Sequence, residues 1–291
     1  MNNLFKRVAL VARQGKPEIV SPLLELAEFL RANEVTVLIE DESVPAELMG
    51  DYQPVPRDTI GRLADLVVVL GGDGTMLSIA RSIAPYRIPL VGINQGRLGF
   101  MTDIPLQGMT QSIGAILLGD FVPEERILLE SVVMRGDQEL FKALSLNDVV
   151  FSRGALGSMI EFEVFIDDQF VYSQRSDGLI VTTPTGSTAY SLSSGGPILH
   201  PTLPAIGLVP ICPQSLNNRP IAVNDSVLVE FLLTRGSEAR VHFDNQSHFN
   251  LQELDRVHIR RYRNSLRLLH PLGYNYYDML RHKLHWGEKL L

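Results

Sequence analysis

Cysteine and tryptophan are almost absent from this chain, since each occurs only once in 291 residues. With Cys212 as the only thiol, no disulfide can form within the chain, which is typical of proteins in a reducing compartment. No apolar run approaches the roughly 18 residues of a membrane-spanning helix, and Lys6 and Arg7 precede only five apolar residues before Arg13. These absences exclude a disulfide framework and favour a soluble cytoplasmic protein without a membrane span or secretion signal.

Positive charge is also scarce. The chain has 26 Lys and Arg residues against 33 Asp and Glu, a formal net charge of −7, and no uninterrupted block of Lys and Arg longer than two residues. Proteins that bind DNA or RNA present a basic surface, so the composition argues against a nucleic-acid partner. Hydrophobic residues make up 45% of the chain, enough for the core of one large domain or of two ordinary domains.

The first 120 residues alternate between short β-type runs and helix-type segments. The β-type runs lie at 7–12, 35–40, 66–70 and 88–93, and the helix-type segments lie at 18–30 and 75–84. Such alternation predicts βαβ units around a parallel sheet, and the consecutive apolar residues are typical of strands covered on both faces. We therefore expect an α/β domain over residues 1–120.

From about residue 121 the apolar residues recur at every second position. In IEFEVFIDDQFVY, Phe162, Val164 and Ile166 follow this period, and Asp167-Asp168-Gln169 supplies a turn. Further β-rich runs lie at 127–134, 179–183, 227–233 and 256–260. The pattern predicts an antiparallel β domain over residues 121–272, and the amphipathic tail over 273–291 is expected to pack on one of the two halves, with the first domain as the candidate.

A glycine-rich turn places an acidic residue where a buried strand meets a helix. Three glycines surround Asp73 in LVVVLGGDGTML, namely Gly71, Gly72 and Gly74. Two interpretations are open: Asp73 caps the helix, or it faces a ligand, such as a phosphate, that approaches the backbone at this end of the sheet. The spacing matches neither common nucleotide loop, because Leu77 stands where the dinucleotide fingerprint needs Gly or Ala and no Gly-Lys-Ser/Thr follows.

A second glycine loop follows the next β-type run, in GINQGRLGFMTD at 92–103. Arg97 is a candidate contact for a phosphate and Phe100 for a nucleotide base. The alternative is a plain turn in which Phe100 joins the core.

Hydroxyl side chains are densest in RSDGLIVTTPTGSTAYSLSSGGPI, at 175–198. A surface loop explains hydroxyl groups, but short hydroxyls beside exposed amides are also what a site for sugars, amides and phosphates requires. Upstream, Asn147 and Asp148 place an amide and a carboxylate beside an apolar strand, either in a turn or as contacts to a ribose.

Several of these segments resemble motifs of bacterial NAD kinases in order and approximate spacing. They are GGDGTML, LNDVV, the 175–198 block, RPI at 219–221 and FDNQ at 243–246. The GGDG signature alone is shared with phosphofructokinases and diacylglycerol kinases, whereas the 175–198 block is far more specific. The resemblance implies an NAD kinase and diacylglycerol kinase-like fold: an α/β domain with a parallel sheet, a C-terminal antiparallel β-sandwich, and substrates in the crevice between them.

The resemblance also implies a reaction, the ATP-dependent phosphorylation of the adenosine-ribose 2′-hydroxyl of NAD to give NADP. A divalent metal ion, Mg²⁺, would accompany ATP, and the enzyme would form a homo-oligomer, a dimer or tetramer. Asp73 matches the family's proton acceptor, and Gly74 would leave room for the ATP phosphates.

The implied nucleotide-binding positions come from both halves of the chain. They are Phe100, Asn147, Asp148, Arg175, Asp177, Thr188, Ala189, Tyr190, Ser191, Leu192, Ser193 and Gln246. Asn147 and Asp148 match the pair that holds adenine and ribose, although many relatives carry Glu at the second position. Arg175 and Asp177 match positions around the nicotinamide half of NAD, and the basic residue at 175 is associated with a preference for NAD over NADH.

Two other functions stay open. A kinase acting on another hydroxyl substrate would keep the GGDG loop but leave the 175–198 block unexplained. A non-catalytic dinucleotide-binding regulator would keep that block without needing ATP. For the NAD kinase, the expected partners are the small molecules NAD and ATP, and neither a nucleic acid nor a membrane.

Overall fold

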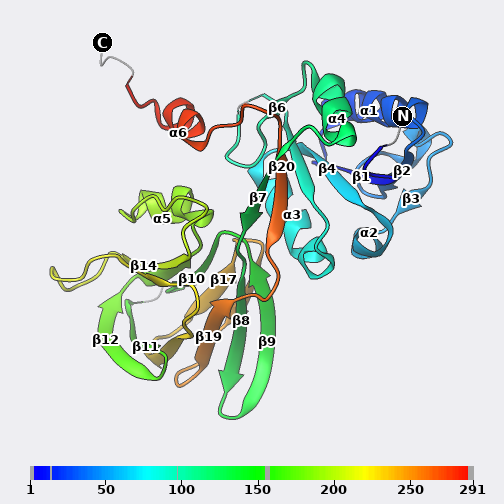
Figure 1. The fold of residues 1–291 in the computed structure, drawn as a ribbon. Helices are drawn as coiled ribbons and strands as arrows, with labels where there is room; N and C mark the ends of the chain where they lie inside the picture. The colour runs from blue at the N-terminus through cyan, green and yellow to red at the C-terminus, as the bar shows by residue number, and fades with distance from the viewer. Residues whose placement is uncertain (1–2, 14, 97, 155–157, 288–291) are drawn as a thin grey trace. The chain divides into compact units, whose positions relative to one another are not determined.

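A computed structural model describes residues 3–13, 15–96, 98–154 and 158–287. The chain divides into two compact units (Figure 1), which are described separately: the first comprises Met1–Glu125 and Leu266–Leu291, the second Arg126–Ser265. Residues 121–125 and 266–272, which the sequence pattern assigns to the β domain, thus lie in the first unit, the latter together with the tail. Within the described residues no helix combines the length and apolar character needed to cross a membrane.

The first unit is built on a mostly parallel sheet. Its strands run in the order β3-β2-β1-β4-β5-β20-β7, with β6 beside β5. Their bounds are β1 Arg7–Ala12, β2 Thr36–Glu40, β3 Pro54–Val55, β4 Leu66–Gly71, β5 Leu90–Asn94, β6 Ile104–Pro105, β7 Val122–Arg126 and β20 Leu266–His270. Every residue of β4 and β5 is buried, as expected for strands covered on both faces. The predicted parallel sheet is confirmed.

In the described part of the first unit the chain forms five α-helices (Figure 1): α1 Val20–Ala32, α2 Arg57–Leu63, α3 Asp73–Ile83, α4 Met109–Leu118 and α6 Tyr276–Leu284. Leu23 and Leu30 of α1 share one core with Ile113 of α4, so these helices cover the same face. The helices predicted at 18–30 and 75–84 are confirmed as α1 and α3. The sequence pattern did not identify α2 or α4 as helices.

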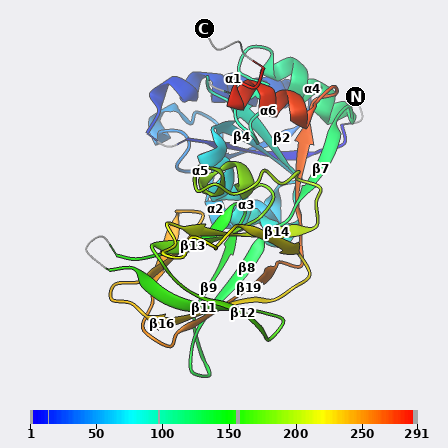
Figure 2. The same ribbon diagram turned by 90° about the vertical axis from the view of Figure 1, so that its left-hand side faces the viewer.

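The second unit is an antiparallel β-sandwich (Figure 2). Its two sheets have the strand orders β15-β14-β13-β10-β17-β18 and β12-β11-β16-β19-β8-β9. The strands are β8 Leu129–Arg135, β9 Gln138–Ser145, β10 Asp148–Ser152, β11 Ile160–Ile166, β12 Gln169–Ser176, β13 Gly178–Thr182, β14 Ala205–Ile211, β15 Ile221–Asn224, β16 Val229–Arg235, β17 Arg240–Phe243, β18 Ser247–Asn250 and β19 Arg256–Arg261. Apolar side chains from both sheets form one core, in which the rings of Phe151 and Phe231 stack with centroids 3.7 Å apart. The predicted fold class is confirmed.

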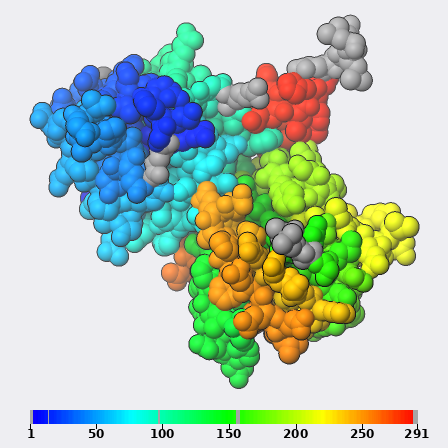
Figure 3. Space-filling view, turned by 180° about the vertical axis from the view of Figure 1, so that it is seen from behind, coloured from blue at the N-terminus to red at the C-terminus, as the bar shows by residue number. Residues whose placement is uncertain are grey.

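Local turns of the sandwich follow the sequence pattern. Asp167 and Asp168 join β11 to β12 with φ angles of 48° and 63°, as a two-residue hairpin turn requires, and Gln169, which the sequence pattern places in the turn, is the first residue of β12. The loop that follows β14, drawn in yellow in Figure 3, contains Arg219 and Pro220 of the RPI motif. Arg219 donates hydrogen bonds of 2.6 and 2.8 Å to the carbonyls of Leu216 and Asn218 in the same loop.

Candidate active site

Asp73 is the first residue of α3, at the carboxyl end of β4. Its carboxylate accepts hydrogen bonds from the backbone N–H groups of Phe100, at 2.9 Å, and Met101, at 3.0 Å, and lies 3.5 Å from the Thr102 hydroxyl. Among the described residues it accepts none from the helix, whose N-cap residue is Gly72. The helix-cap interpretation is therefore wrong. Each carboxylate oxygen has a second lone pair, so Asp73 can still accept a hydrogen bond from a substrate.

Glycine is required at 99 but leaves open space at 72 and 74. A Cβ at Gly99 would lie 2.3 Å from the Asp73 Oδ1 atom, so only glycine lets this loop approach the carboxylate. A Cβ at Gly72 or Gly74 would meet nothing within 4 Å. These two glycines thus leave the N-terminus of α3 accessible to a ligand, and helix N-termini favour phosphate groups.

A cavity of about 510 Å³ opens over this helix end, and its lining contains Gly72, Gly74 and two arginines, Arg13 and Arg57. Arg13 follows β1 directly, at the same sheet edge as Asp73, because the carboxyl ends of the neighbouring parallel strands β1 and β4 lie together. That signal could have identified Arg13 from the sequence. Arg57 opens α2, and no sequence pattern marks it.

Arg57 is held in place by a buried carboxylate. Its guanidinium donates to Glu40, whose side chain is fully buried, and to the hydroxyl of Ser78. Glu40 also accepts from the Ser43 hydroxyl at 2.5 Å, and that hydroxyl accepts from the backbone N–H of Ala12 at 2.8 Å. The network fixes a cation at the edge of the cavity before any anion arrives.

In the second unit, Asp244 organises the segment that contains Asn147 and Asp148. Its carboxylate accepts hydrogen bonds from the backbone N–H groups of Leu146, Asn147 and Asp148 at 2.8, 2.8 and 3.1 Å. The carbonyl of Asn147 accepts from the backbone N–H of Thr183 at 2.9 Å. The FDNQ and LND motifs and the start of the hydroxyl-rich block therefore meet, although sequence reasoning assigned no role to Asp244.

Asp148 is buried beside Asp244. Burial, and to a lesser degree the neighbouring Asp244 carboxylate, raise the pKa of Asp148 to about 7. At neutral pH this carboxyl group is about half protonated, so it can donate a hydrogen bond to a base or accept one from an amine or hydroxyl.

Residues 186–193 contain two short helical turns, a 3-10 turn over Gly186–Thr188 and α5 over Tyr190–Ser193. The hydroxyl of Thr188 donates to the carbonyl of Thr185 at 3.2 Å. Ser191 is fully buried, and its hydroxyl has no hydrogen-bond partner among the described residues. In contrast, Tyr190 is about half exposed and Ser193 is exposed, so this segment presents both to solvent.

Asp177 and Tyr190 line one small cavity of about 240 Å³, together with Arg153. The Arg153 Nε atom donates to the Asp177 carboxylate at 2.7 Å, a contact that sequence reasoning missed. Arg175 is not part of this lining: its side chain is half exposed and lies 3.8 Å from the Glu161 carboxylate on the neighbouring strand.

The remaining candidates differ in their exposure. Ala189 and Leu192 are partly buried, and Gln246 is exposed in the β17–β18 turn. In the first unit the ring of Phe100 is partly exposed, with the Lys283 ammonium 5.6 Å from its centroid. Arg97 lies outside the described residues.

Comparison with known proteins decides between the three functions. Residues 8–121 match the ATP-NAD kinase N-terminal domain, and residues 146–270 match the ATP-NAD kinase C-terminal domain. The chain belongs to the NAD kinase family. This confirms the resemblance of the sequence motifs and makes the chain a phosphotransferase.

Individual members of the NAD kinase family are similar to this chain over its full length. The NAD kinases of Chromobacterium violaceum and Laribacter hongkongensis are 71% and 65% identical, each over 291 residues and 100% of both chains. The crystal structure of a yeast NADH kinase complexed with NADH has a TM-score of 0.89 at 25% identity, covering 100% of this chain and 90% of the other. An NAD kinase from Archaeoglobus fulgidus in complex with ATP shares the fold, with a TM-score of 0.75 at 24% identity over 97% of this chain and 100% of its own.

Proposed function

We propose that this enzyme transfers the γ-phosphoryl group of ATP to the 2′-hydroxyl of the adenosine ribose of NAD, giving NADP and ADP. The observation that carries the proposal is Asp73, a carboxylate held by two loop amides beside a cavity with two arginines. A bond forms between the ribose 2′-oxygen and the γ-phosphorus, and the bond from that phosphorus to the bridging oxygen of ADP breaks. The hydroxyl proton passes to Asp73.

Phosphoryl transfer needs positioning and charge compensation more than covalent chemistry. The exposed amides at the start of α3, with Arg13 and the fixed Arg57, can offset the charge on the ATP phosphates. Mg²⁺ enters as part of the ATP complex. Over the described part of the chain, no group of three or more His, Cys, Asp or Glu side chains is arranged to hold a metal ion.

The second unit binds the dinucleotide in this proposal. Asn147 and Asp148 contact adenine and ribose, Asp177 accepts from the nicotinamide carboxamide, and residues 188–193 line the ligand. Gln246, Arg175 and, from the first unit, Phe100 supply further contacts. Support comes from the shared anchoring of 146–148 by Asp244 and from the common cavity of Asp177 and Tyr190.

The decisive test incubates the purified protein with NAD, ATP and Mg²⁺ and measures NADP with an NADP-specific dehydrogenase. Formation of NADP supports the kinase, whereas dinucleotide binding without product would indicate a regulator. Phosphorylation of a different hydroxyl substrate in place of NAD would indicate another GGDG-type kinase. AMP and adenosine serve as matched acceptors, and phosphorylation of either as efficiently as NAD would contradict the dinucleotide pocket.

Hydrogen exchange tests whether both units contribute to the substrate complex. NAD is expected to slow exchange both at 99–103 and at 182–193. Protection confined to one unit would contradict the proposal.

We further propose a cytoplasmic homo-oligomer, a dimer or tetramer. The single cysteine supports a reducing compartment, and the family resemblance supports the oligomer. Light scattering of the purified protein tests the oligomeric state, and a mass matching one 32.4 kDa chain would contradict it.

A further inference from the structure

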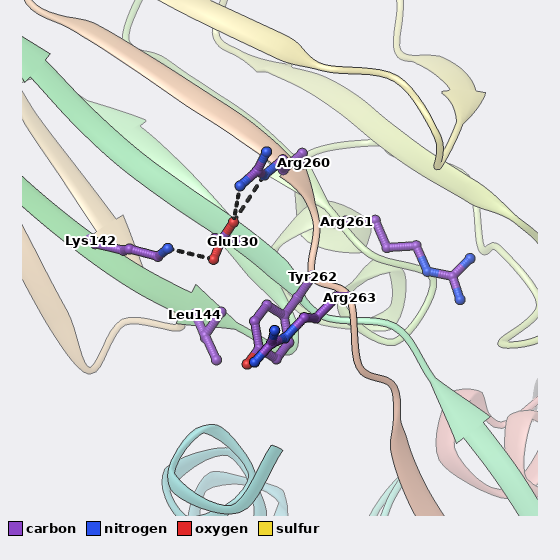
Figure 4. A pocket seen from close by; sticks show the side chains of 7 residues that line it. All are labelled: Glu130, Lys142, Leu144, Arg260, Arg261, Tyr262 and Arg263. Carbon is purple, nitrogen blue, oxygen red and sulfur yellow. Dashed lines mark hydrogen bonds and ion pairs between the residues drawn. The ribbon is translucent and has the colours of Figure 1, made fainter. Parts of the chain in front are cut away.

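A second polar cavity, of about 700 Å³, lies in the sandwich unit along β8, β9 and β19 (Figure 4). None of the residues lining it belongs to the candidate substrate residues. Its lining contains a single acidic side chain, Glu130, and four basic ones, Lys142, Arg260, Arg261 and Arg263. The cavity therefore concentrates positive charge on a chain whose net charge is −7.

Glu130 holds two of these cations in place. In Figure 4 the side chains of Lys142 and Arg260 reach its carboxylate from opposite sides, with contacts of 2.7 Å to the Lys142 Nζ atom and 2.7 and 2.9 Å to the Arg260 guanidinium. Burial raises the pKa of Glu130, but the hydrogen bonds from Lys142 and Arg260 outweigh it and lower the pKa below its usual value. The carboxylate is thus ionised at neutral pH. Its single negative charge holds both cations in place but balances only one of their two positive charges.

Of the other two cations, only Arg263 adds to the excess of positive charge. Arg261 points away from Glu130 in Figure 4 and pairs with the buried Asp225 at 2.7 Å. Arg263 is exposed and has no hydrogen bond or ion pair among the described residues. Two carboxylates therefore face four basic side chains, and a cluster with unbalanced fixed cations attracts anions.

A neighbouring cluster on the same sheet shows the ordinary arrangement. Side chains on a strand alternate between faces, so Arg256 and His258 share the face of Arg260. Both contact the single carboxylate of Glu230, where one arginine balances one acid. The excess of positive charge around Glu130 is therefore a local feature and not a property of the whole sheet.

We propose that the cavity around Glu130 binds a chain of two or more phosphate groups. Its volume lies within the range of small-molecule sites, and phosphate oxygens match fixed guanidinium and ammonium donors. Such a chain belongs to a nucleotide or to inorganic polyphosphate. A nucleotide ring would in addition find the uncharged Leu144 and the aromatic Tyr262 in the same lining.

Isothermal titration calorimetry with tripolyphosphate tests the site. The Arg263→Gln substitution removes an unpaired cation and leaves no carboxylate without its partner, and Lys142→Gln provides a second variant. Arg235→Gln is the matched control, because Arg235 is an exposed arginine of the same sheet outside the cavity. Arg57→Gln, at the cavity of the first unit, distinguishes phosphate binding there from binding here.

The dissociation constant is expected to rise about fivefold in Arg263→Gln, the size of one solvent-accessible ion pair, and more than tenfold in the double variant with Lys142→Gln. In Arg235→Gln and in Arg57→Gln, where Arg263 is intact, tripolyphosphate should bind the cavity around Glu130 with the affinity of the parent. No binding by the parent at millimolar tripolyphosphate, equal affinity in all variants, or a loss confined to Arg57→Gln would each overturn the proposal.

A parallel titration with ADP separates the two sources of the phosphate chain. If the Arg263-dependent affinity for ADP exceeds that for tripolyphosphate, the site is one for nucleotides, and the reverse order assigns it to inorganic polyphosphate. The assay reads binding and not turnover, so its failure leaves NADP formation untouched, and an absence of NADP formation would not affect this site.

Discussion

The substitution Asp73→Asn separates the chemistry of the carboxylate from its structural role. Asp73 accepts hydrogen bonds from two backbone N–H groups through different oxygens, at 2.9 and 3.0 Å. Asparagine keeps the size but has only one acceptor oxygen, so its amide group must face one N–H group of the loop, and that donor is left unpaired. The ionised acceptor for the ribose hydroxyl proton is lost at the same time.

The two losses differ in size. An unpaired N–H group costs roughly 1 to 3 kcal/mol, which lowers the thermal midpoint of a unit of this size by roughly 2 to 12 °C. Loss of a positioned general base lowers kcat by about 10² to 10⁴ fold, equivalent to about 3 to 5 kcal/mol of activation free energy. The fall in kcat of Asp73→Asn should therefore exceed the fall that the unpaired N–H group of the loop would cause by itself.

The assay measures kcat for NADP formation and the thermal midpoint of Asp73→Asn beside the parent. Thr102→Val is the control, since it removes the hydroxyl 3.5 Å from the carboxylate but keeps the base, and its kcat should stay within about threefold of the parent. A folded Asp73→Asn protein with kcat within about tenfold of the parent would refute the assignment. An equal fall in Thr102→Val would attribute the loss to the order of the loop.

Three further predictions concern the other charged groups. Burial and Asp244 raise the pKa of Asp148 to about 7. Between about pH 4 and 7 the folded state therefore keeps a proton on this group that the unfolded state releases. The contribution of Asp148 to the free energy of unfolding thus falls as the pH rises through this range. Asp148→Asn should therefore raise the thermal midpoint above pH 7, by an amount corresponding to roughly 1 to 4 kcal/mol, and the difference should vanish near pH 4. Arg57→Gln should lower kcat/KM for ATP about 10- to 100-fold with little change in the KM for NAD, because Arg57 borders the cavity over the start of α3. Arg175→Gly should change the ratio of kcat/KM for NAD to that for NADH, since a positive charge near the nicotinamide ring distinguishes its cationic and neutral forms.

Each of these predictions has a result that would contradict it. A pH-independent midpoint difference in Asp148→Asn would show that the carboxyl group is not held protonated by its surroundings. Equal losses for ATP and NAD in Arg57→Gln would indicate a general disturbance of the fold. An unchanged ratio in Arg175→Gly would leave Arg175 as a surface partner of Glu161, an exposed pair worth only about 0 to 1 kcal/mol.

The local sequence pattern was sufficient to predict a strand or turn wherever the physical cause of that element lies in neighbouring residues. Strands β1, β4 and β5 appear as apolar runs because both faces of the sheet are covered, and β11 appears as alternation because one face meets the core. The Asp167 turn follows from the backbone geometry that a two-residue hairpin needs. The position of Asp73 at the end of a strand was equally readable from its neighbours.

Long-range pairing could not be read in this way. β20, near the end of the chain, pairs with β5 in the first sheet, a contact between Leu268 and Leu90 that no local pattern encodes. Arg57 is held at the cavity by its hydrogen bond to Glu40. Asp244 accepts hydrogen bonds from the backbone of 146–148, about a hundred positions earlier in the sequence. These partners are invisible in sequence because a hydrogen bond depends on distance in space.

The sequence by itself determined the two fold types, the family motifs and the identity of the acidic residue in the glycine turn, because each depends on residues within a short window. Only the tertiary structure decided what that residue touches. Asp73 could cap its own helix or turn toward another segment, and the choice was made by the 99–102 loop, which brings two N–H groups to the carboxylate in a space that only Gly99 leaves open. Burial likewise decided the protonation of Asp148, since the free energy of a charge depends on the surroundings that the folded chain provides.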